Sequence, residues 1–297
     1  MIVDVHSHTP THRHPVPTDQ ILSSGHWRPD RVVVATTSWD DYEAAFEQVD
    51  VSVVFNIAVD DPLRDTGIPT DPARINEATA EFVAAAPDRR IGFLSVNPLR
   101  PGALGEAERC RSELGLAGIK LGPNYQIFDP LCNAAHELYA YAAEAGLPIL
   151  FHQGASPVRE APLRYAHPLV MDEIAIAHPE LRVVMAHMGH PWQRETIVTI
   201  RKHPHVYADI SALFYRPWSF YEGLRLATEW DVLGKLLFGS DFPIITPAET
   251  IAGLRAVNAV IEGTKLPPVP MDSIESIIHA DALTSLGLKH PAVERYY

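Results

Sequence analysis

The sequence predicts an α/β protein built as a single-domain (β/α)8 barrel over residues 1–297. Eight short runs rich in Val, Ile and Leu alternate with amphipathic stretches, and the polar residues of these runs gather at their C-terminal ends. Such runs are typical of parallel strands that are covered on both faces. The chain has 297 residues, 46% of them hydrophobic, which is enough to bury the core of one such barrel.

The apolar runs give the expected strands. They are Ile2–His6, Val51–Ile57, Ile91–Val96, Gly118–Leu121, Pro148–His152, Arg182–His187, Val206–Ile210 and Leu236–Ser240. Eight strands that alternate with helices favour a closed TIM barrel over an open doubly wound sheet. The C-terminal ends of all the strands then meet at one face, where barrel enzymes carry their sites.

Amphipathic stretches between the runs predict helices. They are Pro72–Ala85, Leu131–Ala145, Met171–His178 and Glu249–Glu262, and a C-terminal helix is expected over residues 272–288. Residues 9–31 interrupt the alternation, because they carry Pro10, Pro15, Pro17, Gly25 and Pro29. We interpret this segment as a loop over the barrel mouth, where substrate enters.

The composition excludes several classes of partner. Lys and Arg total 24 and Asp and Glu total 37, so the formal net charge is −13 with histidine neutral. Such a surface repels phosphate backbones and anionic lipids, which argues against nucleic acid and membranes as partners. The two cysteines, Cys110 and Cys132, have no disulfide or zinc-finger spacing. We expect reduced thiols in a cytoplasmic protein, with no signal peptide and no membrane span.

Five polar residues close four of the expected strands at the same face of the barrel. His6 and His8 close the first, His152 the fifth, His187 the sixth and Asp241 the eighth. Residues two apart on a strand face the same way, so both imidazoles of the first strand can point into the mouth. Neutral imidazoles and a carboxylate are the ligands that a catalytic zinc-like ion requires. The sequence therefore predicts a divalent metal site.

The same stretches resemble a known family. The matching segments are VDVHSH, PDRRIGFLSVNP, GIKLGPNYQIFDP, GLPILFHQG, HPELRVVMAHMGHPW, VYADIS and LLFGSDFP, which run from the first residues to about position 243. This pattern is similar to the amidohydrolase superfamily. It is most similar to the amidohydrolase-related branch, which includes aminocarboxymuconate semialdehyde decarboxylase and γ-resorcylate decarboxylase.

The resemblance implies a role for each of these residues. His6, His8, His152 and Asp241 would bind one divalent metal, zinc in the first instance and manganese as the alternative. His187 would stand beside the metal as a proton carrier or a contact to substrate. Asp241 is a second catalytic candidate, since an ionised carboxylate on the metal is a local base. The resemblance also implies a homo-oligomer.

Other residues have two interpretations each. Lys120 lies at the end of the fourth strand, where two-metal relatives carry a lysine that bridges the ions; it is either a second-metal ligand or, as we prefer, a charge paired near the mouth. Arg13 and Arg159 lie in loops after the first and fifth strands, and each either clamps a substrate carboxylate or is a solvated surface residue. Trp192 either walls the pocket or packs at a helix start.

Asp4 shares the inward face of the first strand with His6 and His8. We expect it to be hydrogen-bonded and to support the site, because an unpaired buried carboxylate is costly.

The resemblance leaves two reactions open. The preferred one is non-oxidative decarboxylation of a small carboxylated cyclic or unsaturated acid, with His187 or Asp241 handling the proton that replaces carbon dioxide. The alternative is hydrolysis of a lactone, ester or amide by a metal-bound hydroxide. A barrel that only stores metal or binds a ligand is disfavoured, because His187 adds a proton-transfer group to the expected ligands.

Overall fold

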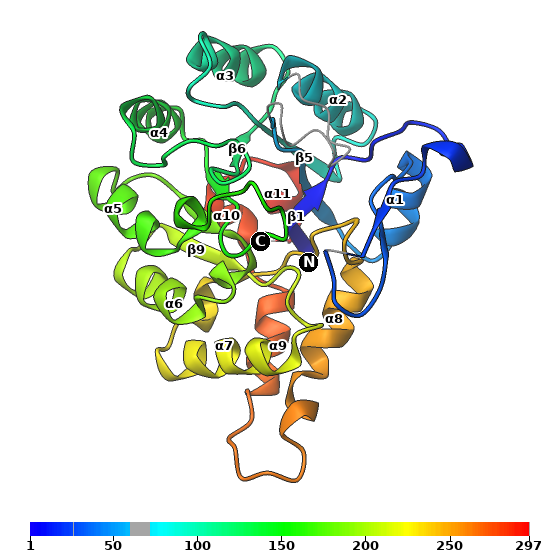
Figure 1. Ribbon diagram of the computed structural model, residues 1–297, viewed down its shortest axis with the longest axis vertical. Helices are drawn as coiled ribbons and strands as arrows, with labels where there is room; N and C mark the ends of the chain where they lie inside the picture. Colours follow the sequence, from blue (N-terminus) through cyan, green and yellow to red (C-terminus); the bar gives the residue numbers. More distant parts are fainter. Residues whose placement is uncertain (26, 60–71, 297) are drawn as a thin grey trace.

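Eight parallel strands form the predicted barrel in the computed structural model, which describes residues 1–25, 27–59 and 72–296 (Figure 1). In sheet order the strands are β1 (Val3–His8), β4 (Val51–Phe55), β5 (Arg90–Leu94), β6 (Gly118–Leu121), β7 (Ile149–Phe151), β8 (Val183–Met185), β9 (Val206–Asp209) and β10 (Leu236–Leu237). Each of the eight runs expected from the sequence overlaps one of them. The order in the sheet follows the order in the chain, as a (β/α)8 barrel requires.

Backbone hydrogen bonds join β1 to residues 238–242, which directly follow β10. Val5 N donates to Phe238 O at 2.9 Å, Asp241 N donates to His6 O at 2.7 Å, and His8 N donates to Phe242 O at 2.8 Å. These bonds close the sheet into a barrel and set residues 238–242 beside β1. The histidines of β1 and Asp241 therefore lie on neighbouring segments, although they are more than 230 positions apart in the sequence.

The side chains of the strands alternate between two cores. In β7, Leu150 is buried inside the barrel with Val5, Phe55 and Phe93. Its neighbours Ile149 and Phe151 belong instead to the core between the strands and the surrounding helices. This alternation follows from the two-residue period of a strand, and it explains why both faces of the strands are apolar.

Helices surround the strands (Figure 1). They are α1 (Trp39–Ala45), α2 (Pro72–Ala84), α3 (Ala103–Ser112), α4 (Asn133–Ala145), α5 (Leu169–Ala177), α6 (Gln193–Lys202), α7 (Pro217–Glu229), α8 (Pro247–Arg255), α9 (Met271–Ile278), α10 (Ala282–Leu286) and α11 (Pro291–Tyr296). Leu283 and Leu286 of α10 pack with Val3 and Val5 of β1 in the inner core. The C-terminal helices therefore cover the end of the barrel opposite the strand C-termini.

Two helix predictions need correction. The single helix expected over residues 272–288 is two helices, α9 and α10, because the side chain of Asp281 accepts a hydrogen bond from Thr284 N and starts a new helix. An N-cap of this kind satisfies a backbone donor that would otherwise lack a partner. The stretch Glu249–Glu262 is also divided: α8 ends at Arg255, and a 3-10 helix covers Val257–Ile261.

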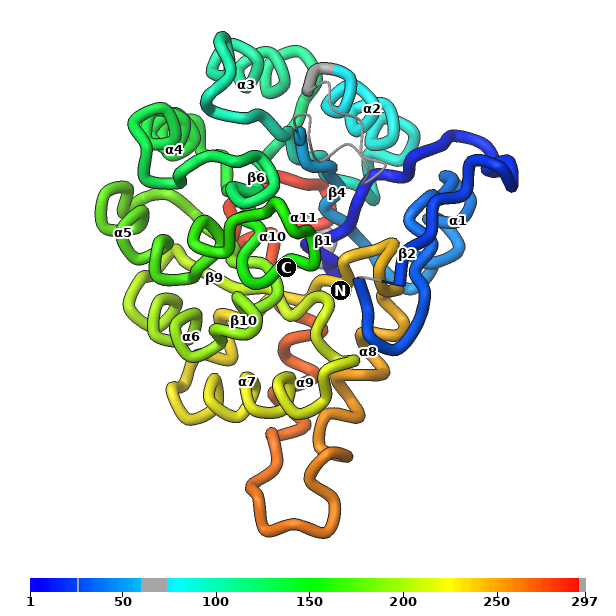
Figure 2. Tube along the Cα trace, viewed as in Figure 1, coloured from blue at the N-terminus to red at the C-terminus, as the bar shows by residue number. Residues whose placement is uncertain are grey.

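Residues 9–31, which the sequence predicts as a loop, carry little regular structure among their described positions. They contain a 3-10 turn (Thr18–Gln20) and β2 (Ser23–Ser24), which pairs antiparallel with β3 (Val33–Val34). In Figure 2 this dark blue segment lies to one side of the strands, next to α1. Within the described part of the chain, no helix combines the length and the apolar character needed to cross a membrane.

The inner core gives a test of the fold. Leu150→Ala removes a fully buried side chain from inside the barrel and is expected to lower the free energy of unfolding by about 2–5 kcal/mol. Leu163→Ala is the matched control, because Leu163 is 48% exposed; we expect a change within about 0.5 kcal/mol. Equilibrium urea denaturation followed by circular dichroism measures both. Equal effects would contradict the placement of Leu150.

Candidate metal centre

His6, His8 and Asp241 converge at the C-terminal end of the barrel. Their ligand atoms lie within 4.8 Å of one another. Asp241 Oδ1 is 3.3 Å from His6 Nε2 and also 3.3 Å from His8 Nε2. Atoms bound at 2.0–2.1 Å to one tetrahedral ion lie about 3.3–3.4 Å apart. The spacing of these three groups therefore fits a shared divalent ion.

His152 lies beside this group, but its ring nitrogens do not lie within 4.8 Å of all three ligand atoms. Its ring centroid is 5.1 Å from that of His187. Its Nε2 atom is buried and has no hydrogen-bond partner among the described residues. A buried imidazole nitrogen without a partner is costly, and a divalent ion would satisfy it. The donor set of three imidazoles and one carboxylate is one that zinc accepts.

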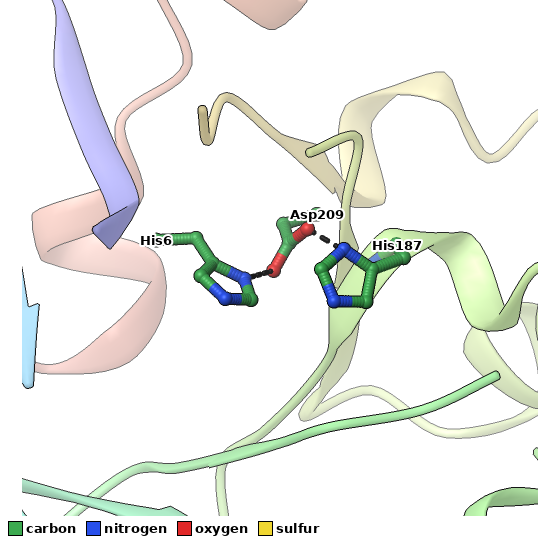
Figure 3. Close-up of side chains that lie close together, drawn as sticks. All are labelled: His6, His187 and Asp209. Carbon is green, nitrogen blue, oxygen red and sulfur yellow. Dashed lines mark hydrogen bonds and ion pairs between the residues drawn. The ribbon is translucent and has the colours of Figure 1, made fainter. Parts of the chain in front are cut away.

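Asp209, at the end of β9, holds two of the histidines in place (Figure 3). Its Oδ2 accepts a hydrogen bond from His6 Nδ1 at 2.8 Å. Its Oδ1 accepts from the backbone N atoms of His187 at 2.9 Å and Ser211 at 3.0 Å, and from the Ser211 hydroxyl. The carboxylate oxygens are thus occupied by donors, so we assign Asp209 to orientation of His6 and not to metal binding.

These bonds fix which nitrogen of each ring carries the proton. His6 donates from Nδ1 to Asp209, so Nε2 keeps its lone pair and faces Asp241. The hydroxyl hydrogen of Ser211 points to Asp209, so Ser211 Oγ accepts from His187 Nδ1 at 2.8 Å. His187 Nε2 is then free to accept a proton.

The backbone at the site is strained. His187 has φ 57° and Asp241 has φ 70°, both in the left-handed region that non-glycine residues rarely adopt. Strain of this kind gathers at functional sites and persists only where surrounding contacts enforce it. The bond from His187 N to Asp209 and the bond from Asp241 N to His6 O are such contacts.

The charge states suit a cation. Burial lowers the pKa of His8, and burial together with His187 holds the pKa of His152 well below its usual range. Burial disfavours the ionised form of Asp241, but its contacts with His6 and His8 hold its pKa well below the usual range. Burial and Lys120 act to lower the pKa of His6, but Asp209 and Asp241 raise it. Neutral imidazoles and an ionised carboxylate are the forms that bind metal, so a metal must displace any proton from His6 Nε2. Burial also lowers the pKa of His187 to about 4, so its ring is neutral near pH 7.

Lys120 is a buried residue beside His6. It is completely buried, with Nζ 3.4 Å from His6 Nε2 and 4.5 Å from the centroid of the Phe55 ring. Burial lowers its pKa to about 7, while Asp209 and Asp241 act in the opposite direction. No carboxylate forms an ion pair with it in the described part of the chain, so neither the ion-paired charge nor the second-metal ligand is established by these contacts.

Asp4 is hydrogen-bonded through one oxygen, as its position on β1 predicts, while its Oδ2 is buried without a hydrogen-bond partner among the described residues. Burial raises its pKa to about 7. Its Oδ1 accepts hydrogen bonds from His6 N at 2.9 Å and Ser240 N at 3.1 Å. It therefore ties the first strand to the segment that leads into Asp241.

The cluster opens into a cavity of about 200 Å³. Its wall includes side chains from several loops: Leu22, Trp27, Asn56, Ile57, Val59, Tyr125, Val158, Leu213, Tyr215 and Arg216, and it also includes His6, His8, Lys120, His152, His187 and Asp241. This volume suits a small molecule. Most of the lining is apolar, and its ionisable groups are the His and Asp cluster with Lys120 on the floor and Arg216 in the wall.

Three substrate contacts expected from the sequence do not line this cavity. Arg13 is exposed and lies over the Trp39 ring at 4.8 Å. Arg159 is exposed, and Trp192 packs its ring 4.8 Å from that of His167. Arg216 and Trp27 are the arginine and the tryptophan that line the cavity among the described residues. The reason is that the path of each loop, which local sequence does not specify, decides which side chains reach the cavity.

Asp209 is the main site residue that the sequence reasoning missed. A signal was present, because Asp209 closes the apolar run Val206–Ile210 as His152 and Asp241 close theirs. What the sequence did not indicate is its contact with His6, 203 positions away.

Comparison with protein families agrees with this geometry. The family described as amidohydrolase matches residues 3–268 of the chain. The chain belongs to the amidohydrolase family. Enzymes of this family depend on divalent metals, and the His and Asp cluster of the barrel mouth supplies the ligand types required. The resemblance found in the sequence is therefore confirmed at the level of the family, and the amidohydrolase described here is an enzyme.

Solved structures share its fold. A dihydroxybenzoic acid decarboxylase from a Polaromonas species, with bound manganese and the inhibitor 2-nitroresorcinol, has a TM-score of 0.65 and 16% identity, covering 100% of this chain and 99% of its own. A probable 2-pyrone-4,6-dicarboxylic acid hydrolase from Acinetobacter baumannii, with citric acid bound, has a TM-score of 0.63 and 14% identity, covering 96% and 99%.

A third structure is the 4-oxalomesaconate hydratase of Rhodopseudomonas palustris, with a TM-score of 0.58 and 18% identity, covering 99% of this chain and 98% of its own. No curated protein sequence gave a significant match. At these identities the likeness establishes the fold, and it does not choose among the three reactions.

The contacts of Asp209 yield a prediction. Asp209→Asn keeps the shape of the side chain but weakens its hydrogen bond with His6 Nδ1, and metal affinity is expected to fall about 10–100-fold. Competition with a fluorescent chelator measures the dissociation constant. Asp172→Asn is the control, since Asp172 binds Lys202 and His203. Unchanged affinity in the Asp209 variant would show that His6 needs no such support.

The ligand assignment yields a second prediction. His152→Ala and Asp241→Ala should each lower the bound metal from about one ion per chain to a small fraction of that value after dialysis, because each removes a ligand. Elemental analysis by mass spectrometry gives the content. His14→Ala, in which an exposed loop histidine is removed, should retain the ion. Full metal content in both ligand variants would refute the assignment.

Proposed function

We propose that this amidohydrolase is a non-oxidative decarboxylase of a small carboxylated cyclic or unsaturated acid. Its one divalent ion would be zinc, with manganese as the alternative, held by His6, His8, His152 and Asp241. The observation that supports this proposal is the position of His187. Its ring centroid is 4.9 Å from that of His6 and 5.1 Å from that of His152, and it lines the same cavity.

Each group has a distinct task in this proposal. A divalent ion held by these ligands would lower the pKa of a water and withdraw electrons from a substrate oxygen. His187 accepts a proton at Nε2, because Ser211 occupies its Nδ1 hydrogen. The apolar wall of the cavity keeps water away from the reacting carbon and strengthens the electrostatic interactions of the floor.

Decarboxylation requires a proton at the carbon that loses carbon dioxide. The bond between that carbon and the carboxylate breaks, its electron pair stays on the carbon, and a proton forms the new C–H bond. His187 takes a proton from a substrate hydroxyl or a water and can return it to the carbon. Asp241 Oδ1, beside both His6 and His8, is the other group within the cluster that can carry this proton.

The substrate class follows from the cavity. Arg216 brings positive charge to a cavity of about 200 Å³ with apolar walls, which favours a small acid with an apolar body. The Polaromonas enzyme with the same fold is a dihydroxybenzoic acid decarboxylase. The homo-oligomer and the cytoplasmic location expected from the sequence stay predictions.

Hydrolysis is the second candidate. The observation in its favour is the similar fold of the probable 2-pyrone-4,6-dicarboxylic acid hydrolase, whose TM-score of 0.63 is close to the 0.65 of the decarboxylase. In a hydrolysis, His187 would remove a proton from the attacking water, and the substrate would be a lactone, ester or amide.

One assay separates the two reactions. Metal-loaded protein is incubated with a panel of aromatic and muconate-type acids and lactones, and carbon dioxide and ring-opened acid are measured separately. We expect carbon dioxide from at least one acid. His187→Ala should lower kcat/KM about 10²–10⁴-fold with metal content unchanged, while His14→Ala keeps the activity. Ring opening without carbon dioxide would replace decarboxylation by hydrolysis.

A further inference from the structure

Arg216 gives the cavity a positive charge that no carboxylate of the described residues neutralises through an ion pair. It is the only arginine among the described residues of the cavity wall, and Asp241 is the only carboxylate there. Arg216 Nη1 donates a hydrogen bond to Ala212 O at 3.1 Å. Arg216 also has a side-chain hydrogen bond with Tyr215, which leaves about three of the five guanidinium N–H donors for a molecule in the cavity.

Tyr215 fixes the position of this guanidinium. The Arg216 guanidinium carbon lies 4.5 Å from the centroid of the Tyr215 ring, and that of Arg28 lies 4.6 Å from the same centroid. Arg28 is 3% exposed and donates two hydrogen bonds to Asp30, at 2.9 and 2.6 Å. Asp30 therefore neutralises Arg28, and Arg216 carries the charge without an ion-pair partner. An arginine on an aromatic face is partly ordered before any ligand binds.

The charges of the cavity are separated in space. Lys120 lies with the cluster, 3.4 Å from His6 Nε2. The contacts of Arg216 are instead with Tyr215 and Ala212, in the loop after β9. A substrate whose reacting group meets the His6 and Asp241 cluster would extend another part of itself toward Arg216.

The net negative charge of the chain makes a local positive charge such as that of Arg216 necessary for binding an anion. The chain has a formal net charge of −13, so an anion reaches this site only if a local cation outweighs the general repulsion. A guanidinium binds a carboxylate through two parallel hydrogen bonds, which is stronger and more directional than contact with a point charge. Burial, with Arg216 as the second cause, lowers the pKa of His190 to about 4, so this neighbour adds no competing charge near pH 7.

We propose that Arg216 binds a carboxylate of the substrate that takes no part in the reaction. The substrate then carries two functional ends: a reacting carboxylate, lactone or amide at the metal cluster, and a retained carboxylate at Arg216. This inference rests on the proposed function only in assuming that the reacting group lies at the cluster, and it holds for decarboxylation and hydrolysis alike. Arg216 is thus a specificity-determining residue.

Binding of simple acids to the metal-loaded full chain tests the proposal without turnover. Isothermal titration calorimetry gives the Kd of benzoate, with one carboxylate, and of isophthalate and terephthalate, which place a second carboxylate at two different spacings. In the wild type we expect the better diacid to bind about 10–100-fold more tightly than benzoate, the range of a charge-assisted hydrogen-bonded pair.

Two variants identify the group responsible. Arg216→Met should bring the ratio of the two Kd values close to one while leaving the Kd of benzoate within about twofold, because only the second carboxylate loses its partner. Arg13→Met is the matched control, since Arg13 also lies over an aromatic ring, at 4.8 Å from Trp39, but outside the cavity; it should keep the wild-type ratio. Thermal melting checks that both variants fold.

The outcomes separate this inference from the proposed reaction. A wild type that binds neither diacid better than benzoate overturns the role of Arg216, and so does an Arg216→Met variant that folds and keeps the wild-type ratio. If the ratio collapses in Arg216→Met alone, the role stands even when neither carbon dioxide nor ring-opened acid is formed, and only the proposed function fails.

Discussion

The organisation of the site depends on the carboxylate of Asp209. Four donors from three residues meet its two oxygens: the His6 ring, the backbone of His187, and the backbone and hydroxyl of Ser211. One buried anion thereby determines the direction of the His6 lone pair, the backbone turn at His187 and, through Ser211, the proton position on the His187 ring. A neutral side chain of the same size would supply fewer of these constraints, because charge-assisted hydrogen bonds are the stronger ones.

The barrel supplies what this carboxylate needs. Parallel strands that are apolar on both faces exclude water beneath the site, and the closed sheet brings β1, β9 and the segment after β10 to one end. In such surroundings an isolated ionised carboxylate would be expensive. The donors around Asp209 and the histidines around Asp241 offset that cost, so burial and function are compatible at these two positions.

The strands and the meeting of His6, His8 and Asp241 at one end of the barrel could be predicted from the sequence because both follow from local pattern. Runs of Val, Ile and Leu give the strands, and the residue that closes each run lies at the functional face. The helix over residues 272–288 was wrong because a single capping residue, Asp281, interrupts a continuous apolar period. Arg13 and Arg159 are predicted as substrate contacts because each lies in a loop after a strand. Only the folded path of a loop decides whether Arg216 or Arg159 reaches the cavity. The polar position of Asp209 in its apolar run was a local signal, but its support of His6 depends on a contact across 203 positions that no local pattern indicates.

The closure of the barrel between β1 and residues 238–242 has a consequence for biosynthesis. The proposed ion would need His6 and His8 together with Asp241, which is synthesised more than 230 residues later, and these segments are neighbours only once the sheet has closed. A ribosome-bound chain that has not yet released its last strand cannot offer the complete ligand set. The proposed site would therefore be completed only after the eighth strand has joined the first, so binding of the ion would follow closure of the barrel.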